Sequence, residues 1–260
     1  MISIIGNKDI KILEEKVGSR LTARLNENRN FFMPLAEKKY FLSFHWFEQE
    51  RVTIYADKQS LLIMTDSDKI KNHAQDIDVE DDGIMQLFEF FLEITGGDVY
   101  KLESMENVIT NLEDKLLTMK KPSTSGINNI ISVRKDLLKM KRYYEQMEFL
   151  TDEIAAIDPT FNFIDKKFDR LLEFVQHLQE YIEQVREAYQ SQIDIEQNSI
   201  MKFFTVITSI FLPLTLIVGW YGMNLQMPEF GWKYGYAFVI GLCVVVTMVM
   251  IYIFKKKKWF

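Results

Sequence analysis

The chain of 260 residues holds one cysteine, five prolines and eleven glycines, and these scarcities exclude several kinds of protein. The single Cys243 cannot form an intrachain disulfide, and His45, His73 and His177 are too scattered for metal-ligand spacing. The first twenty residues lack an apolar core long enough for a signal peptide. The sequence has no phosphate-binding glycine loop, nucleophile elbow or Cys/His cluster. It therefore predicts neither an enzyme nor a bound cofactor.

Charge is missing altogether from two long segments, residues 203–228 and 234–254. The second would form about 31 Å of helix, which matches a bilayer core of about 30 Å. The first holds a span of similar length at 201–221. A buried hairpin in a soluble protein is the alternative, but two adjacent runs of this length favour membrane helices.

The ends of these two segments predict the topology. The linker at 222–233 is short, so both termini lie on the same side of the membrane. Four lysines follow the second span, and the positive-inside rule places them in the cytoplasm: Lys255, Lys256, Lys257 and Lys258. We therefore expect a multi-pass plasma-membrane protein, partnered by the lipid bilayer, with both termini and the basic tail 255–260 inside.

The external loop at 222–233 holds a single acid, Glu229. Aromatic residues that favour the membrane interface cluster around it: Trp220, Tyr221, Trp232, Tyr234 and Tyr236. Gly222 is expected to end the first span, because glycine adopts positive φ without strain.

Negative charge dominates residues 1–200. The whole chain carries a net charge of −6, whereas residues 201–260 carry six bases and one acid, a net charge of +5. Residues 1–200 therefore carry −11. This excess argues against nucleic acid as a partner, because phosphate binding needs a basic surface. It fits a cytosolic domain that tolerates or senses cations.

Residues 1–157 are predicted to form a cytosolic α+β domain, because strand-like segments precede helical ones. The expected strands are 38–47, 51–57 and 60–66, and the expected helices are 83–95, 98–121 and 126–156, with a turn at 121–126. The acids before the first helix partly fit a calcium loop: Asp78, Glu80, Asp82 and Glu89, with Gly83. The upstream strand and the Glu at the third position favour a simple helix start instead.

A stalk helix is predicted at 158–200, beginning with Asp158 as N-cap and Pro159 in the first turn. Apolar residues then follow at steps of three and four: Phe161, Ile164, Phe168, Leu171, Val175, Leu178, Ile182, Val185 and Tyr189. This seam suits either a coiled coil or an amphipathic helix packed on its own domain. Because 160–212 lacks proline and glycine, one helix can continue to about 221.

One face of the first span mixes bulky apolar residues with small or hydroxyl-bearing ones, a mixture without purpose against lipid. Facing a pore, the threonines can contact hydrated ions, the glycine leaves width, and the bulky residues can close it by dewetting. Pro213 deprives the Ser209 carbonyl of its helical donor and predicts a kink. The face comprises Met201, Phe204, Thr208, Leu212, Thr215 and Gly219, with Asn198 one turn below.

The motif YGMN at 221–224 resembles the signature of the CorA family of magnesium transporters. Further matches are FLPLT at 211–215, MPE at 227–229, GWKYGY at 231–236 and KKKKW at 255–259. The resemblance implies a homopentamer whose first spans line one central pore and whose stalk helices continue into the cytoplasm. It also implies divalent cations as partners, with Mg²⁺ as the transported substrate, and a basic ring formed by the lysine tail.

The residues of this motif suit a hydrated ion. Mg²⁺ dehydrates reluctantly, so a mouth that recognises it should offer acceptors to its waters. Asn224 supplies an amide oxygen, and Gly222 and Met223 supply carbonyls. Repeated around an axis, these atoms make a neutral ring. A lone Asn after Gly is otherwise explained by turn chemistry.

The expected function is Mg²⁺ uptake down the electrochemical gradient, inhibited by intracellular Mg²⁺. The resemblance places a regulatory metal site between subunits near Asp165 and Asp169, without assigning a ligand. Transport of Co²⁺, Ni²⁺ or Zn²⁺ on the same architecture is an alternative. A hairpin-anchored scaffold that binds partners through its cytosolic helices is another.

Overall fold

The computed structural model describes residues 2–27, 29–35, 38–47, 50–77, 82–119, 124–223, 231–257 and 259. They form two compact units, Met1–Glu187 and Ala188–Phe260. The boundary between the units falls within the longest helix, α7 (Asn162–Tyr221). Each unit is described by itself below.

The first unit is built on a mixed five-stranded sheet with strand order β1-β5-β4-β3-β2. Its antiparallel part contains β2 (Phe31–Leu35), β3 (Lys39–Trp46), β4 (Glu50–Ala56) and β5 (Leu61–Met64), whereas β1 (Ile2–Ile5) pairs with β5 in parallel. The three inner strands are the three predicted from sequence, and the two edge strands are additional. The predicted α+β class, followed by a long helix and an apolar C-terminal helix, is confirmed.

Side chains alternate between the two faces of the sheet. On one face Phe41, Tyr55 and Leu62 pack with Leu13 of α1 (Ile10–Val17) and with Leu25. The short segments η1 (Asn7–Asp9), α2 (Ser19–Thr22) and η2 (Ala23–Glu27) adjoin α1 along the chain. These elements, together with α3 (Asp68–Gln75), are absent from the expectations above.

The opposite face of the sheet supports α4 (Gly83–Ile94), where the rings of Phe44 and Phe91 lie 6.4 Å apart. Asp82 caps this helix, because its Oδ1 accepts hydrogen bonds from the amides of Ile84 at 3.0 Å and Met85 at 2.8 Å. The predicted helix start is thus confirmed, whereas Asp78 and Glu80 lie outside the described residues. A Cβ at Gly83 would lie 2.3 Å from the Asp57 carbonyl oxygen, so only glycine fits there.

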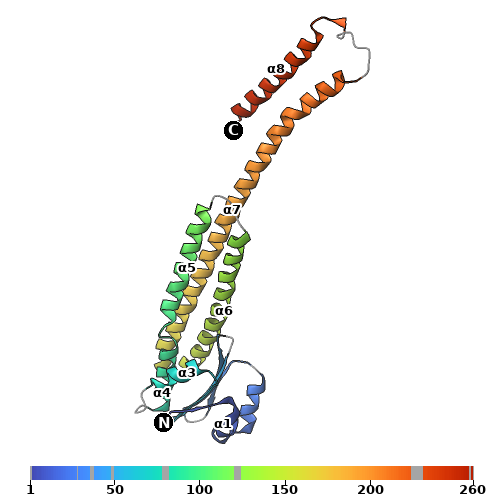
Figure 1. The fold of residues 1–260 in the computed structure, drawn as a ribbon. Coiled ribbons are helices and arrows are strands. Elements are labelled where there is room, and N and C mark those ends of the chain that lie inside the picture. Colours follow the sequence, from blue (N-terminus) through green and yellow to red (C-terminus); the bar gives the residue numbers. More distant parts are fainter. Residues whose placement is uncertain are drawn as a thin grey trace. The chain divides into compact units, whose positions relative to one another are not determined.

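Three helices extend from the sheet, with α7 flanked by α5 (Asp98–Thr118) and α6 (Thr124–Ala155) (Figure 1). The short η3 (Pro159–Phe161) leads into α7, and Asp158 caps it as predicted by accepting from the Thr160 amide at 3.1 Å. The Tyr181 hydroxyl donates to Glu113 Oε2 at 2.7 Å, which ties α7 to α5. Arg134 and Glu183 tie α7 to α6 at 3.4 Å.

The apolar seam, which begins at Phe161 of η3 and continues along α7, is buried within the single chain. All nine seam residues, from Phe161 to Tyr189, are at most 2% exposed, and eight of them belong to the first unit. Of the two interpretations left open by the periodicity, the structure supports an amphipathic helix packed on its own domain. The seam is therefore not available for a coiled coil with other chains.

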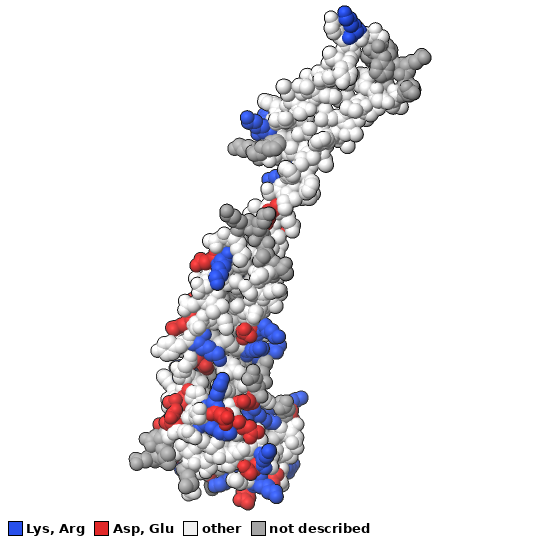
Figure 2. Space-filling model, viewed as in Figure 1, with Lys and Arg blue, Asp and Glu red and all other residues white. Residues whose placement is uncertain are grey.

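The second unit contains the end of α7 and all of α8 (Gly235–Lys256), both long and apolar enough to cross a membrane. Within the single chain, little of the apolar stretch of either helix is buried, whereas the core helix of a soluble protein is mostly buried. The visible surface of this unit is almost free of charge except near its ends (Figure 2). Pro213 lies inside α7, and the helix passes through it without ending.

Candidate functional site

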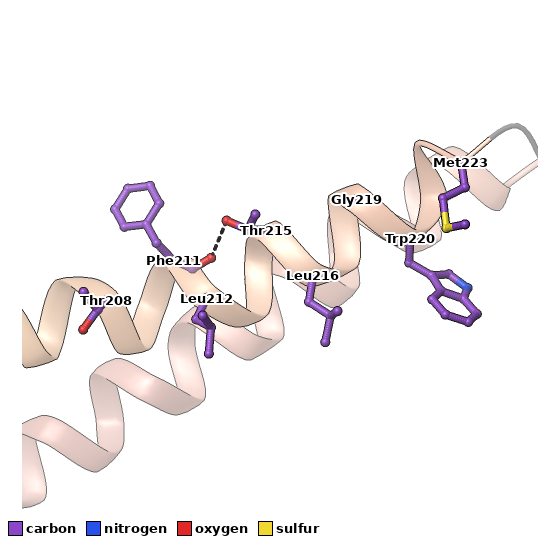
Figure 3. Close-up of a pocket in the computed structure, with 8 residues that line it drawn as sticks. All are labelled: Thr208, Phe211, Leu212, Thr215, Leu216, Gly219, Trp220 and Met223. Carbon is purple, nitrogen blue, oxygen red and sulfur yellow. Dashed lines mark hydrogen bonds between the residues drawn. The ribbon is translucent and has the colours of Figure 1, made fainter.

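A hollow of about 800 Å³ lies along the membrane segment of α7 (Figure 3). It collects four of the predicted face residues, Thr208, Leu212, Thr215 and Gly219, together with Met223 of the expected mouth. The sequence reasoning missed three further lining residues, Phe211, Leu216 and Trp220. Helical spacing could have identified these three residues. A helix face that includes positions i, i+3 and i+4 presents two residues at each turn, whereas the predicted face included one residue per turn.

The two threonine hydroxyls that line this hollow both donate hydrogen bonds to backbone carbonyls of α7. Thr208 Oγ1 donates to the Phe204 carbonyl at 2.9 Å, and Thr215 Oγ1 donates to the Phe211 carbonyl at 2.8 Å. Figure 3 draws the second bond as a dashed line. A hydroxyl whose hydrogen is used keeps its oxygen lone pairs as acceptors. Both oxygens can therefore receive hydrogen bonds from the water shell of a cation.

Gly219 keeps the hollow wide. A Cβ built on Gly219 would meet nothing within 4 Å inside the chain, so no internal contact demands a glycine there. The missing side chain instead leaves space on the outward surface.

The whole predicted face is exposed in the single chain. Asn198, Met201 and Phe204, which lie below the hollow, are solvent-accessible like the others, and Leu212 is 76% exposed. The side of α7 that is less exposed carries Val206, Ile210 and Ile217. The predicted face is thus exposed along its length in the single chain and available to other molecules.

The expected ion-binding mouth is only partly described. Gly222 donates its amide to the Val218 carbonyl at 2.8 Å, and Met223 donates to the Trp220 carbonyl at 3.3 Å. Asn224 and Glu229 lie outside the described residues. As expected, α7 ends at Tyr221, directly before Gly222. The positive φ given as the reason is wrong, because Gly18 is the one described glycine with positive φ. Gly222 instead allows a close approach, since a Cβ there would lie 3.0 Å from the Val218 carbonyl oxygen.

Four acids from α6 and α7 lie near one another in the first unit: Glu148, Asp152, Asp165 and Asp169. Burial and the charges of Asp152 and Asp169 raise the pKa of Asp165, although the Thr151 hydroxyl donates to its Oδ1 at 3.4 Å. Burial and the three neighbouring acids likewise raise the pKa of Glu148. Within the described part of the chain, no three metal-ligating side chains are arranged to hold an ion. The two predicted acids are therefore adjacent to further acids, without forming a complete site in one chain.

The basic tail is anchored at the end of α8. Lys255 and Lys256 occupy its last turn, and the Lys257 amide caps it by donating to the Ile253 carbonyl at 3.0 Å. The Trp259 ring lies 5.5 Å from that of Phe254, and its amide donates to the Phe254 carbonyl at 3.1 Å. These contacts hold Trp259 against the last turn of α8, where Lys255 and Lys256 lie. Lys258 lies outside the described residues.

Comparison with known sequences gives a family match over most of the chain. Residues 31–256 match the family described as CorA-like Mg²⁺ transporter protein. The chain is 29% identical over 168 residues to the cobalt/magnesium transport protein CorA of Thermotoga maritima, covering 61% of this chain and 47% of that protein. It is 44% identical over 95 residues to the magnesium transport protein CorA of Wolinella succinogenes, covering 36% and 30%. The matches span less than half the length of either relative.

Comparison with solved structures supports the fold. The CorA magnesium transporter from Methanocaldococcus jannaschii superposes with a TM-score of 0.80 at 21% sequence identity, covering 99% of this chain and 90% of that one. At this identity the likeness establishes the shared architecture alone.

Proposed function

Because the chain belongs to the family of CorA-like Mg²⁺ transporter proteins, we propose that it carries Mg²⁺ across the plasma membrane into the cell. Transport runs down the electrochemical gradient. The observation that supports this most directly is the exposed face of α7, whose two threonine oxygens serve as acceptors for a hydrated cation. The named relatives are transporters, which supports transport rather than catalysis.

Transport requires several copies of the chain, because a two-helix hairpin cannot enclose a water-filled path. A bare divalent ion in hydrocarbon costs tens of kcal/mol, so the path must be polar throughout. In the proposed homopentamer the exposed face of α7 from each subunit lines one central pore. Met201, Phe204 and Leu212 then form an apolar constriction that closes by dewetting.

Selectivity for Mg²⁺ is proposed to lie at the outer mouth. A ring of Asn224 side chains, with the carbonyls of Gly222 and Met223, would bind the first-shell waters of the ion without displacing them. Glu229 lies in the same loop and would add negative charge near the entrance. The proposed topology places this loop outside and both termini in the cytoplasm, and the lysine tail supports that orientation.

A pore that conducts a divalent cation needs a mechanism that closes it, because uncontrolled influx would overload the cell with the ion. A membrane potential of 100 mV drives a doubly charged ion inward with about 4.6 kcal/mol. At equilibrium this corresponds to an internal Mg²⁺ concentration about a thousandfold or more above the external one. We propose that internal Mg²⁺ bridges subunits through Asp165 and Asp169 and holds the pore closed. The mutual repulsion of the acids around Asp165 supports this, because a cation from solution would relieve it.

The decisive experiment measures Mg²⁺ flux into liposomes that contain the purified full chain, with an interior-negative potential and a trapped Mg²⁺-sensitive dye. Asn224→Ala should abolish uptake while the oligomer keeps its mass. Asn224→Asp should bind Mg²⁺ more tightly but release it more slowly, which lowers both the half-saturating concentration and the maximal flux. Absence of flux in the wild-type chain would overturn the proposal and leave the scaffold alternative.

Cobalt is a second candidate substrate, because one relative is named a cobalt/magnesium transport protein. Flux of Co²⁺, Ni²⁺ and Zn²⁺ in the same liposomes, each in competition with Mg²⁺, ranks the ions. If Mg²⁺ fails to compete with the transition metals, its assignment as the principal substrate is wrong.

A further inference from the structure

A second cavity, which we call the outer groove, lies between the end of α7 and the start of α8. Its volume is about 710 Å³. The walls are largely apolar, with Val218 contributed by α7 and Val239, Ile240 and Val244 contributed by α8. Such a volume suits a small-molecule ligand, since ligand pockets span roughly 300–1,000 Å³.

The depth of the outer groove matches one leaflet of a membrane. Its lining on α8 runs from Gly235 to Val244, which is about 14 Å along the helix axis at 1.5 Å per residue. Half of a hydrocarbon core of about 30 Å is about 15 Å. An extended acyl chain from one leaflet therefore fits the groove along its length.

The mouth of the outer groove is polar and basic. Lys233 lines it, and within the described residues of 203–223 and 231–254 no other side chain is charged. Trp232 also lines the mouth, and its ring packs against Tyr234 at 6.3 Å and Phe238 at 6.0 Å. Aromatic rings of this kind lie at headgroup level. The N-terminal end of α8, with its partial positive charge, opens on the same side.

We propose that the outer groove binds an anionic phospholipid, with one acyl chain between α7 and α8 and its phosphate against Lys233. The base and the helix end together favour a headgroup of net negative charge. The inference requires that both helices cross a bilayer, but it does not depend on Mg²⁺ transport. A chain that retains lipid without conducting ions would leave it intact.

The test counts lipids that remain bound to the full-length oligomer after extraction from vesicles of phosphatidylcholine and phosphatidylglycerol in equal amounts. Native mass spectrometry reports both the bound lipid and the mass of the oligomer. The wild-type chain should retain phosphatidylglycerol in preference to phosphatidylcholine. Lys233→Gln should weaken retention of phosphatidylglycerol about fivefold, the loss expected for one basic side chain near a membrane surface. Lys202→Gln, an exposed lysine on α7, is its matched control and should behave as wild type.

Filling the groove should remove both lipids. Ile240→Trp does so, and Val249→Trp is its matched control, because each native side chain on α8 is 50% exposed and only Ile240 lines the groove. If Ile240→Trp does not assemble, lipid retention by the milder Val244→Phe and by the surface variant Lys233→Gln still tests the proposal. Equal lipid retention in wild type and in the filled variants would overturn the proposal.

Discussion

Single hydroxyl groups give the α7 face its chemistry, and they can be removed without changing its shape. Thr208→Val combined with Thr215→Val replaces two acceptor oxygens by methyl groups of similar size. We expect Mg²⁺ flux in liposomes to fall about tenfold, which corresponds to about 1.4 kcal/mol of hydrogen bonding lost at the barrier. Expression and oligomer mass should remain those of the wild type.

Thr247→Val provides the matched control for the threonine prediction. Thr247 lies on α8 and donates to the Cys243 carbonyl at 2.8 Å, the same kind of bond that both α7 threonines make. Its loss should leave flux unchanged. Equal effects of the α7 and α8 changes would show that the back-bonded hydroxyls matter for the helices and not for the ion.

The carboxyl of Asp165 is expected to destabilise the first unit at neutral pH. Its pKa is raised, so its contribution to stability is present below the ordinary carboxyl pKa and is lost as pH rises through the higher folded value. Asp165→Asn should therefore raise the melting temperature at pH 7, and the gain should disappear as the pH falls to the ordinary carboxyl range. Millimolar Mg²⁺ should stabilise the wild type more than the variant.

Asp136→Asn on α6 is the control for this acid. Asp136 lies 3.7 Å from Lys139, so its removal abolishes an attraction rather than a repulsion. Thermal melts of both variants between pH 4 and pH 8 measure the difference. If Asp165→Asn loses stability at pH 7, the repulsion does not govern this cluster.

Among the elements, α7 is held to the first unit by its buried seam. Phe168 is fully buried and meets Phe91 edge-on at 6.3 Å between ring centroids. Phe168→Ala should lower the free energy of unfolding of the first unit by about 3–5 kcal/mol. Phe163→Ala on the same helix should change it little, because Phe163 is 62% exposed. Hydrogen exchange of peptides from α4 and α7 distinguishes the two, and equal protection in both variants would contradict the burial.

The inner elements of the first unit could be predicted from sequence, but the edges could not. β3, β4 and β5 consist mostly of buried apolar residues, a pattern that is visible in the sequence alone. β1 has four residues and takes its place only through parallel pairing with β5, far along the chain. β2 contains Pro34, which argues against an inner strand and suits the edge where it lies.

The candidate site shows a similar limit. Helical periodicity alone brought Thr208, Leu212, Thr215 and Gly219 to one face, and the structure places all four in one hollow. The width of that hollow depends on neighbouring residues such as Trp220, which sequence spacing does not rank. The seam of α7 was ambiguous for a related reason, since periodicity identifies a buried face without identifying what covers it.

At the scale of the whole molecule, labelling of single introduced cysteines tests the proposed topology. In a Cys243→Ala background, Gly231→Cys introduces a reactive group without steric conflict, because a Cβ at Gly231 meets nothing within 4 Å. A membrane-impermeant maleimide should label this cysteine in intact cells. Lys257→Cys should be labelled only after the cells are opened, since the lysine tail is expected inside. Labelling of Lys257→Cys in intact cells would place the tail outside.

Because the hydroxyls of Thr208 and Thr215 donate to backbone carbonyls, this face should disfavour anions. Water around a cation points its hydrogens outward, toward acceptors, whereas water around chloride presents oxygen lone pairs that seek donors. Because both hydroxyl hydrogens are held by carbonyls of the same helix, these side chains offer lone pairs and no free donor. A wall built from this face would therefore discriminate between ions by the sign of their charge while carrying no charge itself.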